Sequence, residues 1–137
     1  MGGVLLYGSY GYTGKLIAAA AVDRDVTLIL AGRDERQLSQ QADRLDCPYR
    51  SFPLDSPATA SAALDGVDVV LNCAGPFVNT YRPLVEACLA TDTDYLDITG
   101  EPTVFREIRA YDDAATEAGV TLLPGVGFDV VPTDCLA

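Results

Sequence analysis

The sequence predicts an α/β protein built on a doubly wound parallel sheet with helices on both faces. Short apolar segments alternate along the 137-residue chain with longer segments of helical character, which is the order of repeated β-α-β units. The connections between these segments are short and therefore favour right-handed crossovers. The first apolar segment leads through a glycine-rich turn into a helix, as in dinucleotide-binding folds. We expect one three-layer αβα domain over residues 1–137, with six strands in the order 3-2-1-4-5-6.

The glycine-rich turn at residues 8–14 follows a strand that we predict at residues 4–7. Gly8, Gly11 and Gly14 have the spacing G-x-x-G-x-x-G, a variant of the dinucleotide-binding fingerprint. One glycine permits the tight turn, one lets the backbone approach a pyrophosphate, and one lets the following helix pack closely. That helix offers unpaired N–H groups and a partial positive charge to the phosphates. Taken alone, the motif is also explained by a turn that merely requires glycine.

Hydroxyl side chains lie between the three glycines, just before the helix predicted at residues 15–21. Ser9, Tyr10 and Thr13 can donate hydrogen bonds to the pyrophosphate, and Thr13 is the better placed because it lies near the helix start. The candidate cofactor-binding residues of the turn are Gly8, Ser9, Tyr10, Gly11, Tyr12, Thr13 and Gly14.

The second strand, predicted at residues 26–31, is continuously apolar, which indicates burial on both faces. Arg33 follows it, and Asp34 can cap a helix that runs to about Leu45. A site specific for NAD usually has an acidic residue here for the ribose 2′-hydroxyl, whereas arginine suits a 2′-phosphate. A capping Asp34 would point away from the site. Arg33 therefore favours NADP over NAD, although a lone arginine is commonly a solvated surface charge.

A third, more polar strand is expected at residues 49–54, near the edge of the sheet. It leads into a helix that starts at residues 55–57 and ends at Leu64. Asp55 has two interpretations at this point. Its carboxylate can accept a hydrogen bond from the adenine amino group, or it can cap the helix.

The fourth strand is predicted at residues 67–72, and the loop after it has small side chains where a cofactor would pass. Its candidate cofactor contacts are Asn72, Cys73, Ala74 and Gly75. Phe77 is expected near the cofactor ring. Cys73 has no basic partner in the sequence, so we interpret it as a packing residue and not as a nucleophile.

The rest of the chain continues the alternation. We expect a helix at 79–91, a fifth strand at 95–98, a helix from 102 to about 118 capped by Gly119, and a sixth strand at 120–123. The residues that follow these strands, at 97–101 and 125–129, would border the nicotinamide and substrate cavity. We interpret their acids as structural, one by one. Residues 130–137 indicate the start of another helix, so we expect the chain to be the N-terminal part of a longer enzyme.

The composition excludes several classes of function. Twenty acidic residues against nine basic ones give a net charge of −11, which argues against nucleic acid as a partner. Lys15 is the single lysine, and an acidic surface with so little lysine predicts a salt-adapted protein. No apolar segment is long enough to span a membrane and no basic-apolar leader is present. We therefore expect a cytoplasmic protein.

Missing residue types narrow the chemistry further. The chain has no histidine, which removes Ser-His-Asp and Cys-His catalysis and argues against a metal site. It has neither the Tyr-x-x-x-Lys pair of short-chain reductases nor the phosphate-binding loop of kinases and GTPases. Four widely spaced cysteines are expected as reduced, mostly buried thiols.

Taken together, the motifs resemble the N-terminal domain of saccharopine dehydrogenase-like oxidoreductases, near the branch of trans-acting enoyl reductases. The resemblance rests on Val4 to Gly14, Ala31 to Arg33, Asn72 to Phe77, Tyr95 to Glu101, Gly125 to Asp129 and Pro132 to Asp134. It implies an NAD(P)-binding Rossmann domain joined to a C-terminal substrate and dimerisation domain. It also implies that the glycines bind the pyrophosphate and that Arg33 binds the 2′-phosphate.

The sequence thus predicts a domain that holds NADP, or alternatively NAD, for hydride transfer to a small imine, amino-acid or enoyl substrate. No catalytic residue can be assigned, and the chain alone is expected to be inactive. Two alternatives stay open, because fold and motif do not separate them. One is a regulatory protein that senses NADP without turnover, and the other is an interaction module with a vestigial site.

Overall fold

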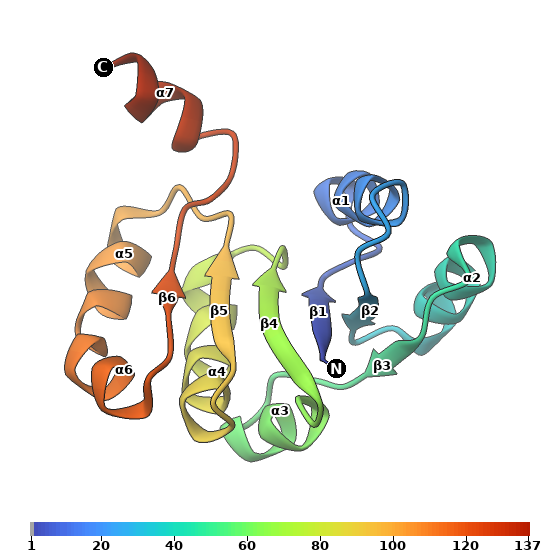
Figure 1. Ribbon diagram of the computed structural model, residues 1–137, viewed down its shortest axis with the longest axis horizontal. Coiled ribbons are helices and arrows are strands. Elements are labelled where there is room, and N and C mark those ends of the chain that lie inside the picture. The colour runs from blue at the N-terminus through green and yellow to red at the C-terminus, as the bar shows by residue number, and fades with distance from the viewer. Residues whose placement is uncertain (1) are drawn as a thin grey trace.

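The computed structural model describes residues 2–137 and contains the predicted six-stranded parallel sheet, in the order β3-β2-β1-β4-β5-β6 (Figure 1). The strands are β1 (Gly3–Tyr7), β2 (Leu28–Gly32), β3 (Tyr49–Ser51), β4 (Val67–Asn72), β5 (Asp94–Asp97) and β6 (Leu122–Leu123). The strand order reverses between β1 and β4. In open sheets of this kind, ligands bind at the carboxyl ends of the strands beside that reversal.

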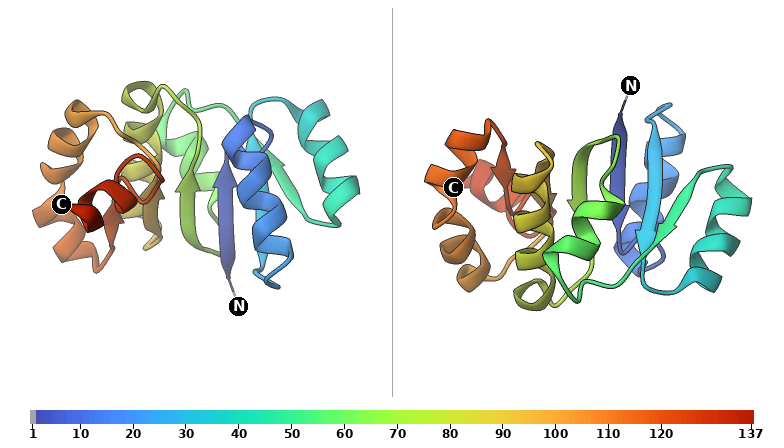
Figure 2. Two further views of the ribbon diagram at one scale, coloured as in Figure 1. Left: turned by 90° about the horizontal axis from the view of Figure 1, so that it is seen from above. Right: turned by 90° about the horizontal axis from the view of Figure 1, so that it is seen from below.

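Helices lie on both faces of the sheet and complete the three layers (Figure 2). They are α1 (Tyr12–Val22), α2 (Glu35–Leu45), α3 (Pro57–Ala63), α4 (Phe77–Ala90), α5 (Pro102–Arg109), α6 (Asp112–Ala118) and α7 (Val131–Leu136). One apolar cluster joins the sheet to α1 and α2, and the other joins it to α3, α4 and α5. α7 stands apart from both clusters and buries none of its residues.

The core is formed by the central strands, as their continuous apolar character predicts. Leu5, Leu6, Leu30 and Val70 are fully buried, and each such aliphatic side chain contributes about 1.5–3 kcal/mol. Leu5 and Leu6 point to opposite faces and so belong to different clusters. Burial on both faces fixes the register of β1 between its two neighbours.

Local capping chemistry sets the helix ends. Asp34 caps α2 as predicted, accepting a hydrogen bond from Gln37 N at 3.1 Å, and Gly119 ends α6 in a left-handed conformation with φ of 70°. The cap of α3 is Ser56, whose hydroxyl accepts from Thr59 N at 3.2 Å. The capping interpretation of Asp55 is therefore wrong, because the residue next to Pro57 holds that position.

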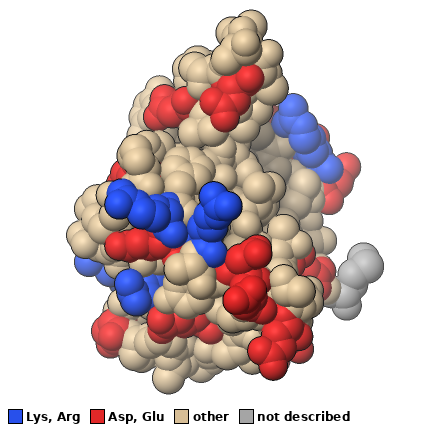
Figure 3. All heavy atoms as spheres, turned by 90° about the vertical axis from the view of Figure 1, so that its left-hand side faces the viewer, with Lys and Arg blue, Asp and Glu red and all other residues tan. Residues whose placement is uncertain are grey.

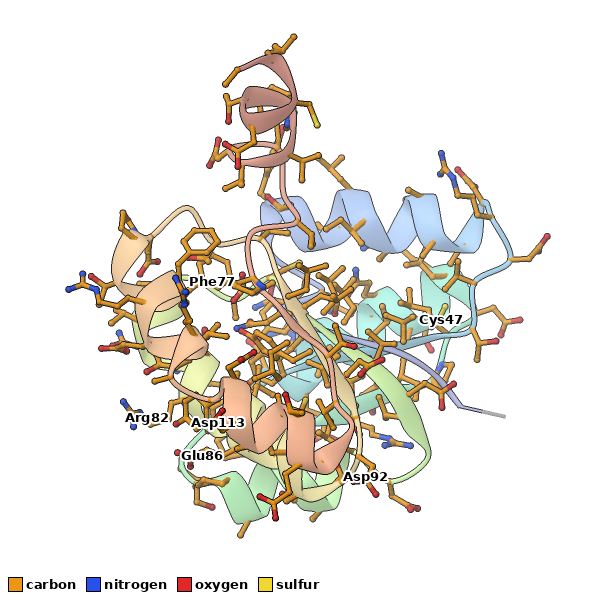
Figure 4. The ribbon with its side chains drawn as sticks, turned by 60° about the vertical axis from the view of Figure 1, so that its left-hand side comes forward. Cys47, Phe77, Arg82, Glu86, Asp92 and Asp113 are labelled. Atoms are coloured by element: carbon orange, nitrogen blue, oxygen red, sulfur yellow. The ribbon has the colours of Figure 1, made fainter. Side chains whose placement is uncertain are left out.

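Several predicted boundaries are also wrong. β2 begins at Leu28 and not at residue 26, and α1 begins at Tyr12 and not at residue 15, so Thr13 and Gly14 lie in its first turn. β3 ends at Ser51 and not at residue 54, since Pro53 has no N–H group to continue the ladder. β6 is shorter than predicted and begins at Leu122. The helix expected over 102–118 is divided into α5 and α6 at Tyr111, whose hydroxyl donates to Glu86 of α4 at 2.9 Å. Figure 4 shows Glu86 on α4 beside the start of α6.

All four cysteines are free thiols, but the expectation that most are buried is wrong. Cys88 is buried, Cys47 and Cys73 are half-buried, and Cys135 is exposed on α7. Within residues 2–137, no helix is both long and apolar enough to cross a membrane. The same residues contain no cluster of three or more side chains that could hold a metal ion.

Candidate cofactor site

The glycine-rich turn between β1 and α1 is shaped by contacts that leave no room for a Cβ atom. Gly8 has φ of +82°, and a Cβ there would lie 2.9 Å from Ala74 N. A Cβ on Gly14 would lie 2.2 Å from Gly8 O. Gly11 N donates to Gly8 O at 3.1 Å and closes the turn. Gly8 therefore permits the tight turn, and Gly14 lets α1 begin directly against it.

The first turn of α1 presents backbone donors without partners. Its N-cap, Gly11, provides no side-chain hydrogen bond, and the first turn has no acidic residue. The first backbone bond of the helix runs from Lys15 N to Gly11 O at 2.9 Å. Within the described chain, the N–H groups of residues 12–14 therefore donate to no internal partner, and the helix dipole adds positive charge. Such a helix start fits a pyrophosphate.

The side chains of the turn differ in what they can offer a ligand. Tyr12 and Thr13 are exposed, with 85 % of Tyr12 accessible. Ser9 is fully buried, and its hydroxyl donates to Gln41 Oε1 at 2.8 Å. Gln41 Nε2 returns a hydrogen bond to Ser9 O at 2.8 Å. The Ser9 hydroxyl therefore joins the turn to α2. It is not free to donate to a pyrophosphate at the start of α1, as the sequence analysis expected.

Tyr10 also points away from the start of α1. Its hydroxyl oxygen accepts from Arg33 N at 3.1 Å and from Asp34 N at 3.0 Å, so it lies at the carboxyl end of β2. The same loops are joined by Gly8 N and Ser9 N, which both donate to the carbonyl of Ala31. These hydrogen bonds thus join the turn after β1 to the turn after β2, and together the two turns form one surface at the ends of these strands.

A cleft of about 520 Å³ runs from this surface across the ends of the strands. Its lining includes Arg33, Asp55, Ala74 and Gly75. Arg33 is exposed and also faces a shallower hollow of about 620 Å³ beside the start of α2. The structure therefore brings Arg33, Asp55 and the loop after β4 together in one cleft, next to the glycine-rich turn.

Asn72 and Cys73 lie at the start of that loop, and Asn72 is hydrogen-bonded to it. Asn72 is fully buried, and its amide donates to the hydroxyls of Thr80 and Tyr95 while its carbonyl accepts from Ala74 N at 3.0 Å. Burial raises the pKa of the Cys73 thiol to about 12, and the charge of Asp97 adds to this. Cys73 is therefore a neutral packing group, as the sequence predicted.

Asp97 extends the same network to the end of β5. Its carboxylate accepts from Thr99 N and Gly125 N on one oxygen and from the hydroxyl of Tyr95 on the other. Burial raises the pKa of Asp97, and the hydrogen bonds from Thr99, Gly125 and Tyr95 oppose that rise. Asp97 thus holds the loops after β5 and β6 together.

Glu101 connects these loops to α4. Its two carboxylate oxygens accept from Phe77 N at 2.8 Å and Val78 N at 3.2 Å, the first two residues of that helix. Figure 4 shows Phe77 at this end of the molecule. A carboxylate at a helix N-terminus is favourable, so Glu101 is a structural acid, as predicted for the acids after β5.

Sequence reasoning missed the partners that orient the predicted residues. Gln41 and Thr80 belong to none of the motifs, and Tyr95 belongs to one without a predicted role, although polar residues at positions 95 and 97 of a buried strand were a usable signal. Alternating polar side chains on one face of such a strand must find hydrogen-bond partners. No comparable signal marked Gln41.

A doubly wound sheet with a glycine-rich turn, unpaired N–H groups and a cleft at the strand-order reversal defines a dinucleotide-binding domain. The sequence of residues 4–123 matches the family of saccharopine dehydrogenase NADP-binding domains, and the chain belongs to this family.

Individual relatives agree with this assignment. The chain is 34 % identical to a trans-acting enoyl reductase of Mycobacterium tuberculosis, over 96 % of the chain and 33 % of that protein. It therefore spans about a third of the length of such relatives. Among solved structures, saccharopine dehydrogenase (L-Glu forming) from Saccharomyces cerevisiae superposes with a TM-score of 0.78 at 21 % identity, covering 92 % of this chain and 27 % of that one. The leucoanthocyanidin reductase–NADPH complex from Vitis vinifera gives 0.65 at 19 %, covering 88 % and 48 %. Both share the fold.

Proposed function

We propose that this chain is the cofactor domain of an NADP-dependent oxidoreductase and binds NADP(H) across the carboxyl ends of β1, β2 and β4. One observation carries the proposal. The start of α1 has three N–H groups without a partner in the described chain, and Arg33 lies at the end of β2, which hydrogen bonds from the intervening turn join to Tyr10. This arrangement offers donors to a pyrophosphate and a bidentate cation to a 2′-phosphate.

Each candidate residue has a role in this proposal. Residues 12–14 bind the pyrophosphate through their backbone, while Gly8, Ser9 and Gly11 shape the turn. Asp55 is exposed in the cleft and not used as a cap, so its carboxylate is free to accept from the adenine amino group. Ala74 and Gly75 line the same cleft, and Asn72 holds Ala74 in place by accepting from its N–H group.

When bound, the nicotinamide supplies hydride chemistry, and this domain orients it. The 34 % identity to a protein named trans-acting enoyl reductase favours an enoyl substrate over the imine and amino-acid substrates. This chain covers a third of such relatives. We assign substrate binding and a homodimer interface to the two thirds of their length that it does not cover. Four free thiols support a reducing, cytoplasmic location.

The cofactor assignment is tested by titrating the chain with NADPH and NADH by calorimetry. We expect NADPH to bind more tightly, and Arg33→Glu to lose at least about tenfold in NADPH affinity, because a charged hydrogen-bonded pair is replaced by repulsion. Arg106→Glu, the same charge change on the exposed side of α5, serves as the control and should keep the preference. Unchanged selectivity in Arg33→Glu would defeat the assignment.

The oxidoreductase assignment needs a different readout. A protein as long as these relatives should oxidise NADPH when an enoyl substrate is added. The loss of the absorbance of reduced nicotinamide measures this reaction. Tight NADPH binding without turnover on any enoyl, imine or amino-acid substrate would instead support an NADP-sensing protein.

A further inference from the structure

The hydroxyl of Tyr10 has its two acceptor positions occupied. It accepts hydrogen bonds from the backbone of Arg33 and of Asp34, at 3.1 and 3.0 Å. A phenol oxygen carries one proton in addition to its lone pairs. With both N–H groups on the oxygen, that proton has to be donated in another direction.

Among the described residues this proton has no hydrogen-bond acceptor, which leaves it free for a ligand in the hollow beside Arg33. Tyr10 lines this hollow together with Arg33, Asp34, Glu35 and Gln37. The carboxylate of Asp34 is committed to the start of α2, where it accepts from both the backbone and the side-chain nitrogen of Gln37. Within the described residues, the Tyr10 hydroxyl donates no hydrogen bond to the Asp34 carboxylate.

Gly32 explains how Tyr10 reaches this position. A Cβ on Gly32 would lie 2.5 Å from Tyr10 Cε1, so only glycine lets the aromatic ring lie across the end of β2. The ring then places its hydroxyl under the backbone of the next two residues. Gly32, Tyr10 and Arg33 thus form one structural unit, although Tyr10 is far from the other two in sequence.

We propose that Tyr10 determines the preference for a 2′-phosphate: it donates its proton to that phosphate and positions Arg33 beside it through the Arg33 N–H. This inference rests on the proposed binding of NADP(H). A neutral hydroxyl donor and a guanidinium then share one phosphate group, and the fixed backbone keeps both in register.

The test compares Tyr10→Phe with wild type in titrations with NADPH, NADH, 2′,5′-ADP and ADP. Tyr10→Phe keeps the ring and removes the hydroxyl, so affinity for NADPH and 2′,5′-ADP should fall about tenfold. Affinity for NADH and ADP should change less than about twofold, because neither has a 2′-phosphate. Tyr111→Phe, which loses a phenol hydrogen bond to Glu86 far from the cleft, is the matched control.

Gly32→Ala provides a second, independent variant, since it displaces the Tyr10 ring without changing a proposed ligand atom. It should reduce the same preference, with thermal melting confirming that the variant is folded. If wild type prefers NADPH and both variants retain that preference, the role of Tyr10 is refuted and the proposed function stands. If wild type binds neither nucleotide, the proposed function fails as well.

Discussion

Cys73 and Asp97 lie close enough for the Asp97 charge to raise the pKa of the Cys73 thiol, and their surroundings determine their chemistry. The carboxylate accepts three hydrogen bonds, while the thiol is kept neutral by burial and by the nearby negative charge. A thiol sits close to the expected path of the cofactor, yet it lacks the thiolate character that a nucleophile requires.

This contrast predicts selective alkylation. Burial raises the pKa of the Cys73 thiol and of the Cys88 thiol to about 12. At pH 8 such a thiol is ionised in only about one molecule in 10⁴. Iodoacetamide should therefore modify the exposed Cys135 first, while Cys73 and Cys88 react only after unfolding. Peptide mass spectrometry with and without urea measures this order. Rapid labelling of Cys73 in the folded chain would contradict the account.

At the scale of elements, Glu101 joins the loop after β5 to the start of α4 through two backbone N–H groups. Glu101→Ala removes both acceptors, so hydrogen exchange at Phe77 and Val78 should accelerate and stability should fall by about 1–2 kcal/mol. Glu117→Ala, an exposed acid on α6, is the control. Unchanged exchange at both amides would show that the carboxylate does not hold this helix.

The order of the strands and helices could be predicted from the sequence better than the directions of the side chains in the turns between them. The order of strands followed from alternation and short connections, and the Asp34 cap and the Gly119 end followed from local chemistry. The directions of Ser9 and Tyr10 did not, because they depend on Gln41 and Gly32, more than 20 positions away along the chain. The break at Tyr111 lies beside a contact with α4, a helix more than 20 positions away along the chain, that no local pattern predicts.

At the scale of the whole molecule, the surface is dominated by acid, although individual faces carry charges of both signs, as on the side of α5 and α6 (Figure 3). A net charge of −11 on 137 residues produces self-repulsion that salt screens, with a Debye length of about 3 Å at 1 M. We predict that the melting temperature rises between low and molar KCl. A constant or falling melting temperature would remove the proposal of salt adaptation.

We propose that NADPH lies across the strand ends with its pyrophosphate on the start of α1 and its 2′-phosphate at the end of β2. An NMR titration of the ¹⁵N-labelled chain with NADPH tests it residue by residue. If NADPH binds in this way, the largest shifts occur at the amides of Tyr12, Thr13, Gly14 and Arg33. Shifts confined to the opposite end of the sheet, around Asp65 and Gly66, or no saturable shifts at all, would contradict it.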